Sequence, residues 1–134
     1  MKIKQLLREG YAAFEVPERA RNELARLFPP KFPQFIGHHI TSVFGVKRDD
    51  KLPLPLGYKV AVRVVGYAVE DGLEALVVTV NNATHREDGK RYHITWSLDR
   101  SKGKKPVDSN DLIARGFDLV KVPFTFETDL QYFD

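Results

Sequence analysis

The chain has 134 residues, of which 43% are hydrophobic and 29% are charged, and this is typical of one globular domain rather than of a disordered or fibrous protein. We therefore expect a single domain over residues 1–134. The absence of cysteine excludes disulfides, thiolate nucleophiles and sulfur-ligated zinc. The formal net charge of +3 weakly favours an anionic ligand.

The apolar runs and the start of the sequence bear on localisation. No apolar run approaches the roughly 20 residues that a membrane-spanning helix requires. Glu9 lies where a signal peptide would have its long apolar stretch, and Leu6 and Leu7 fit a short helical turn instead. We therefore expect a cytoplasmic protein with no membrane partner.

The first part of the chain predicts a strand, a helix and a second strand. Residues 10–16 are apolar and aromatic enough for a strand. Pro17 suits the first turn of a helix, and apolar residues then recur at helical spacing until Pro29 and Pro30 end the helix. Residues 35–46 form a long, partly polar run that predicts another strand.

The second part of the chain is predicted to form mainly strands. Residues 58–69 and 74–80 are β-branched runs joined by Glu70-Asp71-Gly72, and Asp-Gly favours a tight hairpin because it adopts positive φ angles easily. Further strands are expected at residues 91–98, 117–122 and 124–126, with a short capped helical turn at residues 109–113. The predicted fold class is α+β, with a mostly antiparallel sheet and few helices.

One tripeptide occurs twice in the predicted strands, as His39-Ile40-Thr41 and His93-Ile94-Thr95. Because successive side chains of a strand point to opposite faces, each copy presents an imidazole and a hydroxyl on one face. If the two strands lie close together, one histidine can act as general base and the other as general acid on a single phosphate. The threonine hydroxyls can donate hydrogen bonds to the non-bridging oxygens. This chemistry requires no metal and no cofactor.

Paired His-x-Thr motifs on strands are the defining feature of the 2H phosphoesterase superfamily, which the sequence resembles over most of its length. Residues 10–28 are similar to the first lobe of that family, and residues 92–98 with residues 105–110 resemble the second motif of cyclic phosphodiesterase domains in RNA ligase and RNA repair proteins.

The resemblance implies a two-lobed sheet, with His39 and His93 catalytic and Thr41 and Thr95 binding the phosphate. It also implies a nucleotide or RNA substrate, such as RNA ends with a 2′,3′-cyclic phosphate, 2′–5′ linkages or cyclic nucleotides. The interval between the two motifs is short for the family, which implies a smaller surface for recognising a base.

Several residues near the second motif can be interpreted either as part of the binding groove or as structural or solvated residues. Ser97 is expected on the same face as His93 and Thr95 and could extend the polar groove. Lys104 and Lys105 belong to a basic loop that either holds the phosphate tail of a nucleotide or is simply solvated. Tyr92 and Trp96 are expected on the opposite face, where packing in the core is favoured over stacking on a base.

Other functions remain open alternatives. A polar strand face can be no more than the solvent-exposed side of a structural or interaction domain. The chain could also be a non-catalytic module that binds RNA or nucleotides, or a hydrolase of cyclic oligonucleotide signals.

His38 neighbours His39 but should point to the other face, and the histidines lack the spacing of a metal site.

Overall fold

The computed structural model describes residues 9–134, with the exception of the Val122 side chain. The helical turn predicted around Leu6 and Leu7 lies outside the described residues. In chain order the elements are β1 (Gly10–Glu15), α2 (Glu18–Leu27), β2 (Gln34–Phe35), β3 (His39–Val46), β4 (Lys59–Glu70), β5 (Leu73–Val80), β6 (His93–Leu98), a 3-10 helix (Arg100–Lys102), α3 (Asp108–Ala114) and β7 (Asp118–Phe133). No helix in this part of the chain is long and apolar enough to cross a membrane.

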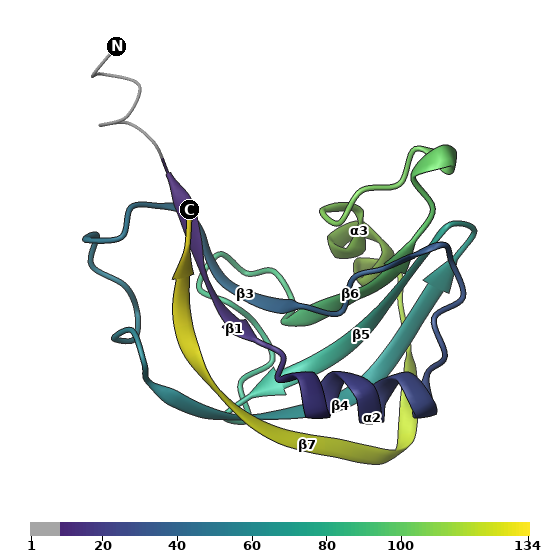
Figure 1. Ribbon diagram of the computed structural model, residues 1–134, viewed down its shortest axis with the longest axis horizontal. Coiled ribbons are helices and arrows are strands. Elements are labelled where there is room, and N and C mark those ends of the chain that lie inside the picture. The colour runs from purple at the N-terminus through teal and green to yellow at the C-terminus, as the bar shows by residue number, and fades with distance from the viewer. Residues whose placement is uncertain (1–8) are drawn as a thin grey trace.

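The strands form one curved sheet (Figure 1) in the order β2-β6-β5-β4-β7-β1-β3. Wherever the structure describes a strand pairing, that pairing is antiparallel. The long strand β7 pairs with β4 through its first part and with β1 through its last residues, so it joins the two halves of the sheet. The α+β class and the mostly antiparallel sheet that the sequence predicts are therefore confirmed.

The two outermost strands of the sheet, β2 and β3, are consecutive in the sequence and are joined by residues 36–38. The backbone N–H groups of Ile36 and Gly37 donate to β6, at 2.8 and 3.0 Å, while the carbonyl of His38 accepts a hydrogen bond from Val16 at 2.8 Å. The chain thus changes its partner from β6 to the end of β1 within three residues. As a result, β3 lies beside β6 across the middle of the curved sheet (Figure 1).

Hydrophobic clusters lie on both faces of the sheet. One cluster includes Ala20 and Leu24 of α2 and alternate residues of β5 such as Leu76 and Val78. The other packs α3 against the remaining residues of β5, among them Ala75 and Val77. The alternation of β5 therefore explains why this strand is buried on both sides, with a helix against each face.

Most of the predicted elements are present, with two differences. The helix after Pro17, the β4–β5 hairpin and the helical turn near residue 110 are confirmed. The strand predicted over residues 35–46 is divided into β2 and β3, because the chain changes its partner at residues 36–38. The strands predicted on either side of Pro123 are one strand, β7, whose pairing with β4 is irregular there and so does not need a proline N–H.

Gly37 occupies the point where the chain changes partner. Its φ of +61° is a left-handed conformation, and a Cβ placed there would lie 2.9 Å from the Trp96 ring. Gly89 also has a positive φ, +85°, but a Cβ at that position would meet nothing within 4 Å. Both glycines therefore adopt a positive φ that disfavours a residue with a Cβ, but of the two only Gly37 also lacks the space for a Cβ.

We predict that Gly37→Ala lowers the free energy of unfolding by more than Gly89→Ala does. The positive φ alone costs about 1–2 kcal/mol for a residue with a Cβ, and at Gly37 the Trp96 ring must also move. Chemical denaturation of the two variants measures the difference. An equal loss in both variants would show that the close approach to Trp96 is unimportant.

Candidate functional site

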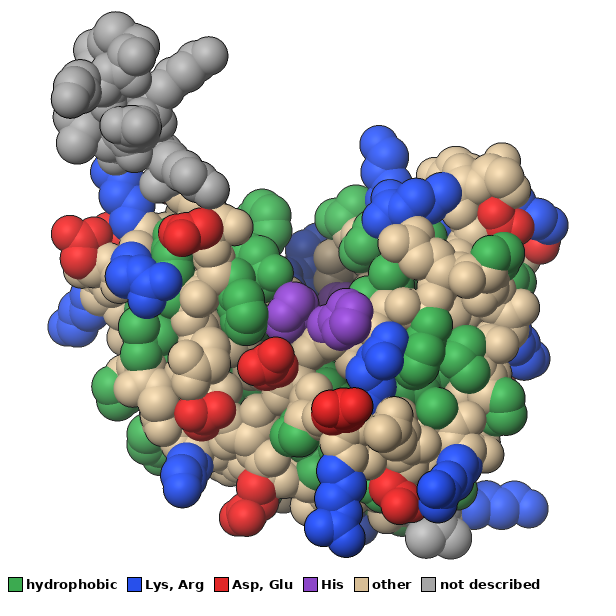
Figure 2. Space-filling model, viewed as in Figure 1, with side chains coloured by type: hydrophobic (Ala, Val, Ile, Leu, Met, Phe, Trp, Pro, Cys, Tyr) green, Lys and Arg blue, Asp and Glu red, His purple; other side chains and the backbone are tan. Residues whose placement is uncertain are grey.

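A cleft of about 690 Å³ lies between β3 and β6, and both His-x-Thr motifs line it. His39 and Thr41 come from β3, and His93 and Thr95 come from β6. Figure 2 shows histidine side chains at a hollow in this face of the molecule. The four residues that the sequence singles out as a pair of motifs are therefore brought to one concave site.

Strand alternation places these side chains as the sequence predicts. Ile40 and Ile94, the middle residues of the two motifs, are fully buried in the same hydrophobic cluster. Each isoleucine anchors its strand in the core, so the histidine and threonine on either side must face away from that cluster. The motif thus combines an anchor with two polar groups directed into the cleft.

His93 is held in one tautomer by the backbone. Its Nδ1 atom lies 2.9 Å from the carbonyl oxygen of Arg91. Because a carbonyl only accepts, Nδ1 must carry the hydrogen, and Nε2 is the atom of the neutral ring that can take up a proton. Burial lowers the pKa of His93 and the nearby Arg86 lowers it further, while the hydrogen bond to Arg91 opposes them. His93 is therefore mainly neutral at neutral pH.

His39 lies among aromatic rings. Its ring centroid is 4.5 Å from that of Phe133 and 5.7 Å, edge to face, from that of Tyr11. Burial lowers the pKa of His39, and His38 lowers it too, whereas the carboxylate of Glu15 raises it. His39 thus has a carboxylate that favours its protonated form, while the charged neighbour of His93 is a guanidinium.

The two threonines differ in their surroundings. Thr41 is half-buried on β3. The Thr95 hydroxyl is buried, lies 2.9 Å from the Ser109 hydroxyl and donates to the carbonyl of Pro106 at 3.2 Å. Ser109 belongs to α3, so the packing of this helix fixes the Thr95 side chain. To donate to a phosphate, the Thr95 hydroxyl would release Pro106 and accept from Ser109.

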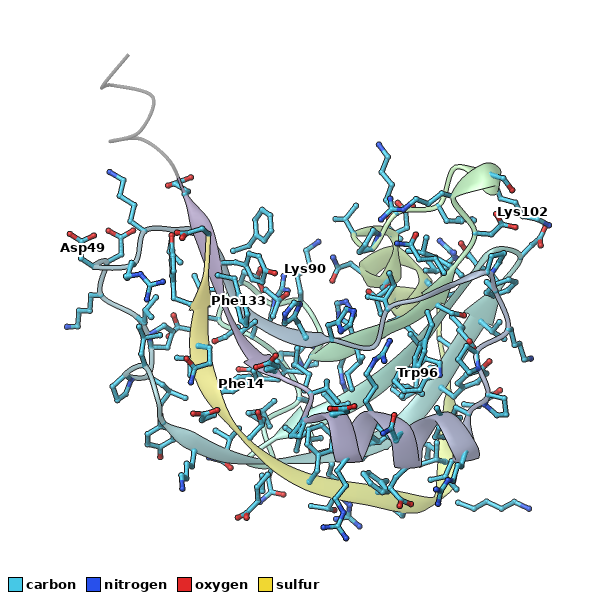
Figure 3. The ribbon with its side chains drawn as sticks, in the orientation of Figure 1. Phe14, Asp49, Lys90, Trp96, Lys102 and Phe133 are labelled. Atoms are coloured by element: carbon cyan, nitrogen blue, oxygen red, sulfur yellow. The ribbon has the colours of Figure 1, made fainter. Side chains whose placement is uncertain are left out.

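A charged turn at residues 86–90 also lines the cleft, and its role was not predicted from the sequence. The Arg86 guanidinium donates to Asp88 through Nε at 3.0 Å and Nη2 at 2.7 Å, and its side chain is only 8% exposed. Asp88 also accepts from the backbone of Lys90 at 3.0 Å, and the pKa of its carboxyl is lowered chiefly by the Arg86 hydrogen bond. Lys90 lies near the hollow (Figure 3). The turn therefore fixes a guanidinium close to His93.

The remaining candidates lie away from the cleft. Ser97 is fully buried, donates to Glu74 at 2.5 Å and accepts from the backbone of Phe32 at 3.2 Å. Its alternation with Thr95 is broken because the β5–β6 register shifts beside Glu74. Lys104 pairs with Glu70 at 2.6 Å, and neither it nor Lys105 is among the described residues that line the cleft.

The aromatic residues beside the second motif pack in the core, as predicted. Trp96 is fully buried and donates its indole N–H to the carbonyl of Phe28 at 2.7 Å. It lies in the layer between the sheet and α2 (Figure 3). Tyr92 packs, partly buried, against the same cluster.

His38 is exposed and lies outside the cleft lining. Over residues 9–134, no group of three or more His, Asp or Glu side chains is placed to hold a metal ion. Comparison with known proteins gives no match, whether to family models, to curated proteins or to solved structures.

Proposed function

We propose that this protein is a metal-independent phosphoesterase of the 2H type, which hydrolyses cyclic phosphate or phosphodiester bonds of RNA ends or nucleotides. The observation that carries the proposal is that both His-x-Thr motifs, from distant parts of the sequence, line one cleft. We infer that a single phosphate bound in that cleft meets both imidazoles and both threonine hydroxyls. The curved antiparallel sheet, with one motif on each half, is also consistent with the two-lobed 2H fold.

The surroundings of the two histidines favour different roles. His93 is suited to be the general base, since its Nδ1 hydrogen is held by Arg91 and its protonated form is disfavoured by burial and by Arg86. We assign the general acid to His39: burial lowers its pKa too, but the Glu15 carboxylate opposes that shift, whereas the charged neighbour of His93 adds to it. Two groups with different preferences for the proton divide the acid and base roles between them.

The proposed reaction is an in-line hydrolysis with two proton transfers. A water oxygen attacks phosphorus while its proton passes to Nε2 of His93. The bond from phosphorus to the ribose oxygen breaks, and His39 gives its proton to that departing oxygen. The threonine hydroxyls and Arg86 interact with the negative charge on the non-bridging oxygens. The product is a phosphate monoester.

The first prediction from the proposed function is that His39→Ala and His93→Ala each remove hydrolysis. Loss of a positioned general acid or base typically lowers a rate by about 10²–10⁴-fold. The assay follows nucleoside 2′,3′-cyclic phosphates, 2′–5′ oligonucleotides and cyclic dinucleotides by chromatography in the presence of a chelator. Turnover of cyclic dinucleotides alone would identify a hydrolase of nucleotide signals.

His38→Ala is the matched control, because His38 is the adjacent histidine, is exposed and does not line the cleft. We expect this variant to keep the wild-type rate. A wild-type protein that binds these nucleotides without hydrolysing them would instead be a binding module. The proposal fails if the wild type has no turnover, or if both alanine variants keep it.

The second prediction concerns pH. The pKa values of both histidines are lowered from the usual value of 6.5. Because the bell-shaped profile of kcat/KM reports the free enzyme, its midpoint is the mean of the two pKa values and must lie below pH 6.5. The rate falls on the acid side as the base is protonated and on the alkaline side as the acid loses its proton. A midpoint at pH 7 or above contradicts this assignment.

The third prediction concerns Arg86. Arg86→Met keeps the aliphatic stem but removes the charge, and we expect kcat/KM to fall by roughly 10²–10³-fold, as when one donor to a developing oxyanion is lost. Because the Arg86 charge lowers the pKa of His93, the acid limb of the profile should also move to higher pH. Arg86→Lys should restore the position of that limb and only part of the rate, since lysine keeps the charge without the forked contact to Asp88.

Arg26→Met provides the control for loss of an arginine. Arg26 pairs with Glu23 on the surface of α2, and its side chain is 79% exposed. This variant should match the wild type in rate and in pH profile. An Arg86→Met enzyme with an unchanged acid limb would show that Arg86 does not act on the reacting groups.

A further inference from the structure

Three aromatic rings form one wall of the cleft region, contributed by three neighbouring strands. The rings of Phe44 and Tyr11 are stacked with centroids 6.1 Å apart and an interplanar angle of 18°. Tyr11 is stacked in turn on Phe133, at 5.3 Å and 20°. These residues, Phe44, Tyr11 and Phe133, are called the aromatic wall below. Figure 3 shows Phe133 beside β1, at the end of β7.

Phe44 is the exposed member of the aromatic wall and lines the cleft. Its side chain is 75% exposed, although removal of a phenylalanine ring from water is favourable. On the same cleft, Val107 is 65% exposed and comes from the segment just before α3. The cleft therefore presents two exposed apolar side chains, one from β3 and one from the segment before α3.

An irregularity in β3 turns Phe44 into the cleft. Residues at even numbers, such as Ile40, should point away from His39 and Thr41 in a regular strand. The register with β1 passes from Thr41 to Val43 between successive residues of β1, so Ser42 is an extra residue. After it Val43 packs against the core and Phe44 shares the cleft with His39.

The aromatic wall is continuous with the proposed catalytic site. The Tyr11 ring lies edge to face with the His39 ring, at 5.7 Å between centroids, and is stacked on Phe44, at 6.1 Å. A phosphate beside His39 therefore lies at one end of a series of rings that leads through Tyr11 to Phe44. His39 is the proposed proton donor to the departing ribose oxygen. A nucleobase that reaches Phe44 therefore belongs to the nucleoside that carries this oxygen.

On the basis of the proposed function, we propose that Phe44 is a base-stacking residue that binds the nucleobase of the nucleoside whose ribose oxygen leaves phosphorus. A flat exposed ring favours a flat ligand, and stacking accepts any base because every base has a π face. The Arg86 guanidinium and the histidines account for the phosphate of the same ligand. The substrate class is thus a nucleoside cyclic phosphate or an RNA end, rather than a phosphodiester without a base.

The test compares two substrates that differ only in the base. Adenosine 2′,3′-cyclic phosphate carries the base, and methyl riboside 2,3-cyclic phosphate has a methyl group in its place. We expect the wild type to favour the adenosine compound in kcat/KM by roughly 5- to 150-fold, the range for stacking of one base. Phe44→Ala should abolish this preference without changing the rate on the methyl riboside, and Phe44→Trp should keep it.

Leu119→Ala is the matched control, since Leu119 is 77% exposed and is outside the cleft lining. It should keep the wild-type preference. A preference that survives in Phe44→Ala, or that disappears equally in Leu119→Ala, overturns the inference while hydrolysis itself stands.

Calorimetric binding of the same two compounds separates this inference from the proposed function. If the wild type hydrolyses neither compound nor any other nucleotide of the assay above, the proposed function fails, and binding of the two compounds still reports on the aromatic wall. Tighter binding of the adenosine compound that is lost in Phe44→Ala supports base stacking. Equal binding of both compounds by the wild type overturns it.

Discussion

Residues 36–38 hydrogen-bond first to β6 and then to the end of β1, and the candidate site depends on this change of partner. His39 follows directly, so the first motif begins where the chain has just left the strand that carries the second. The separation of the two imidazoles is therefore set by backbone hydrogen bonds. Gly37 makes the change possible in the space beside Trp96. A rigid connection of this kind lowers the cost of arranging two catalytic groups around one phosphate.

Burial of the two histidines favours the general base, which must be neutral, and disfavours the general acid, which must be protonated. It lowers the pKa values of both histidines and so favours the neutral base. The same burial disfavours the protonated acid, and only His39 has a carboxylate nearby, Glu15, that opposes it. Arg86 has a similar double effect, since its charge favours a bound phosphate and also keeps His93 neutral. A doubly anionic ligand would reverse part of this effect by stabilising both protonated rings.

The sequence predicted the fold class and which residues of each motif share a face, because both depend on regular patterns. Alternation placed Ile40 and Ile94 in the core, and their neighbours had to face the cleft. The errors lie where the pattern is interrupted. The extra residue in β3 turns Phe44 toward the cleft, and the shifted register of β6 turns Ser97 away from it. The sequence does not reveal either irregularity, because Val43 and Phe44 are both apolar and Ser97 keeps the two-residue spacing from Thr95 that a regular strand would have.

Arg86 was missed for a different reason, since its position depends on hydrogen bonds within a turn. Gly89 and the charged residues around it are typical of a turn, and such a turn usually leaves its charged side chains in solvent. Here Asp88 accepts two hydrogen bonds from the Arg86 guanidinium and one from the backbone of Lys90. These bonds keep the guanidinium in a buried position. An isolated arginine in a loop carries no sequence signal that distinguishes this arrangement.

Ser97 has a positional role that links the two motifs. Its hydroxyl and the buried Glu74 carboxylate hold the backbone of Phe32 and Lys31, at 3.2 and 2.8 Å, and the Trp96 indole holds Phe28. These contacts fix the segment that leads from α2 to the change of partner. The strand of the second motif therefore determines where the first motif begins. A polar residue that extends the His-x-Thr pattern by two positions thus acts through the backbone of residues 31–32, and its effect on the cleft is to position His39.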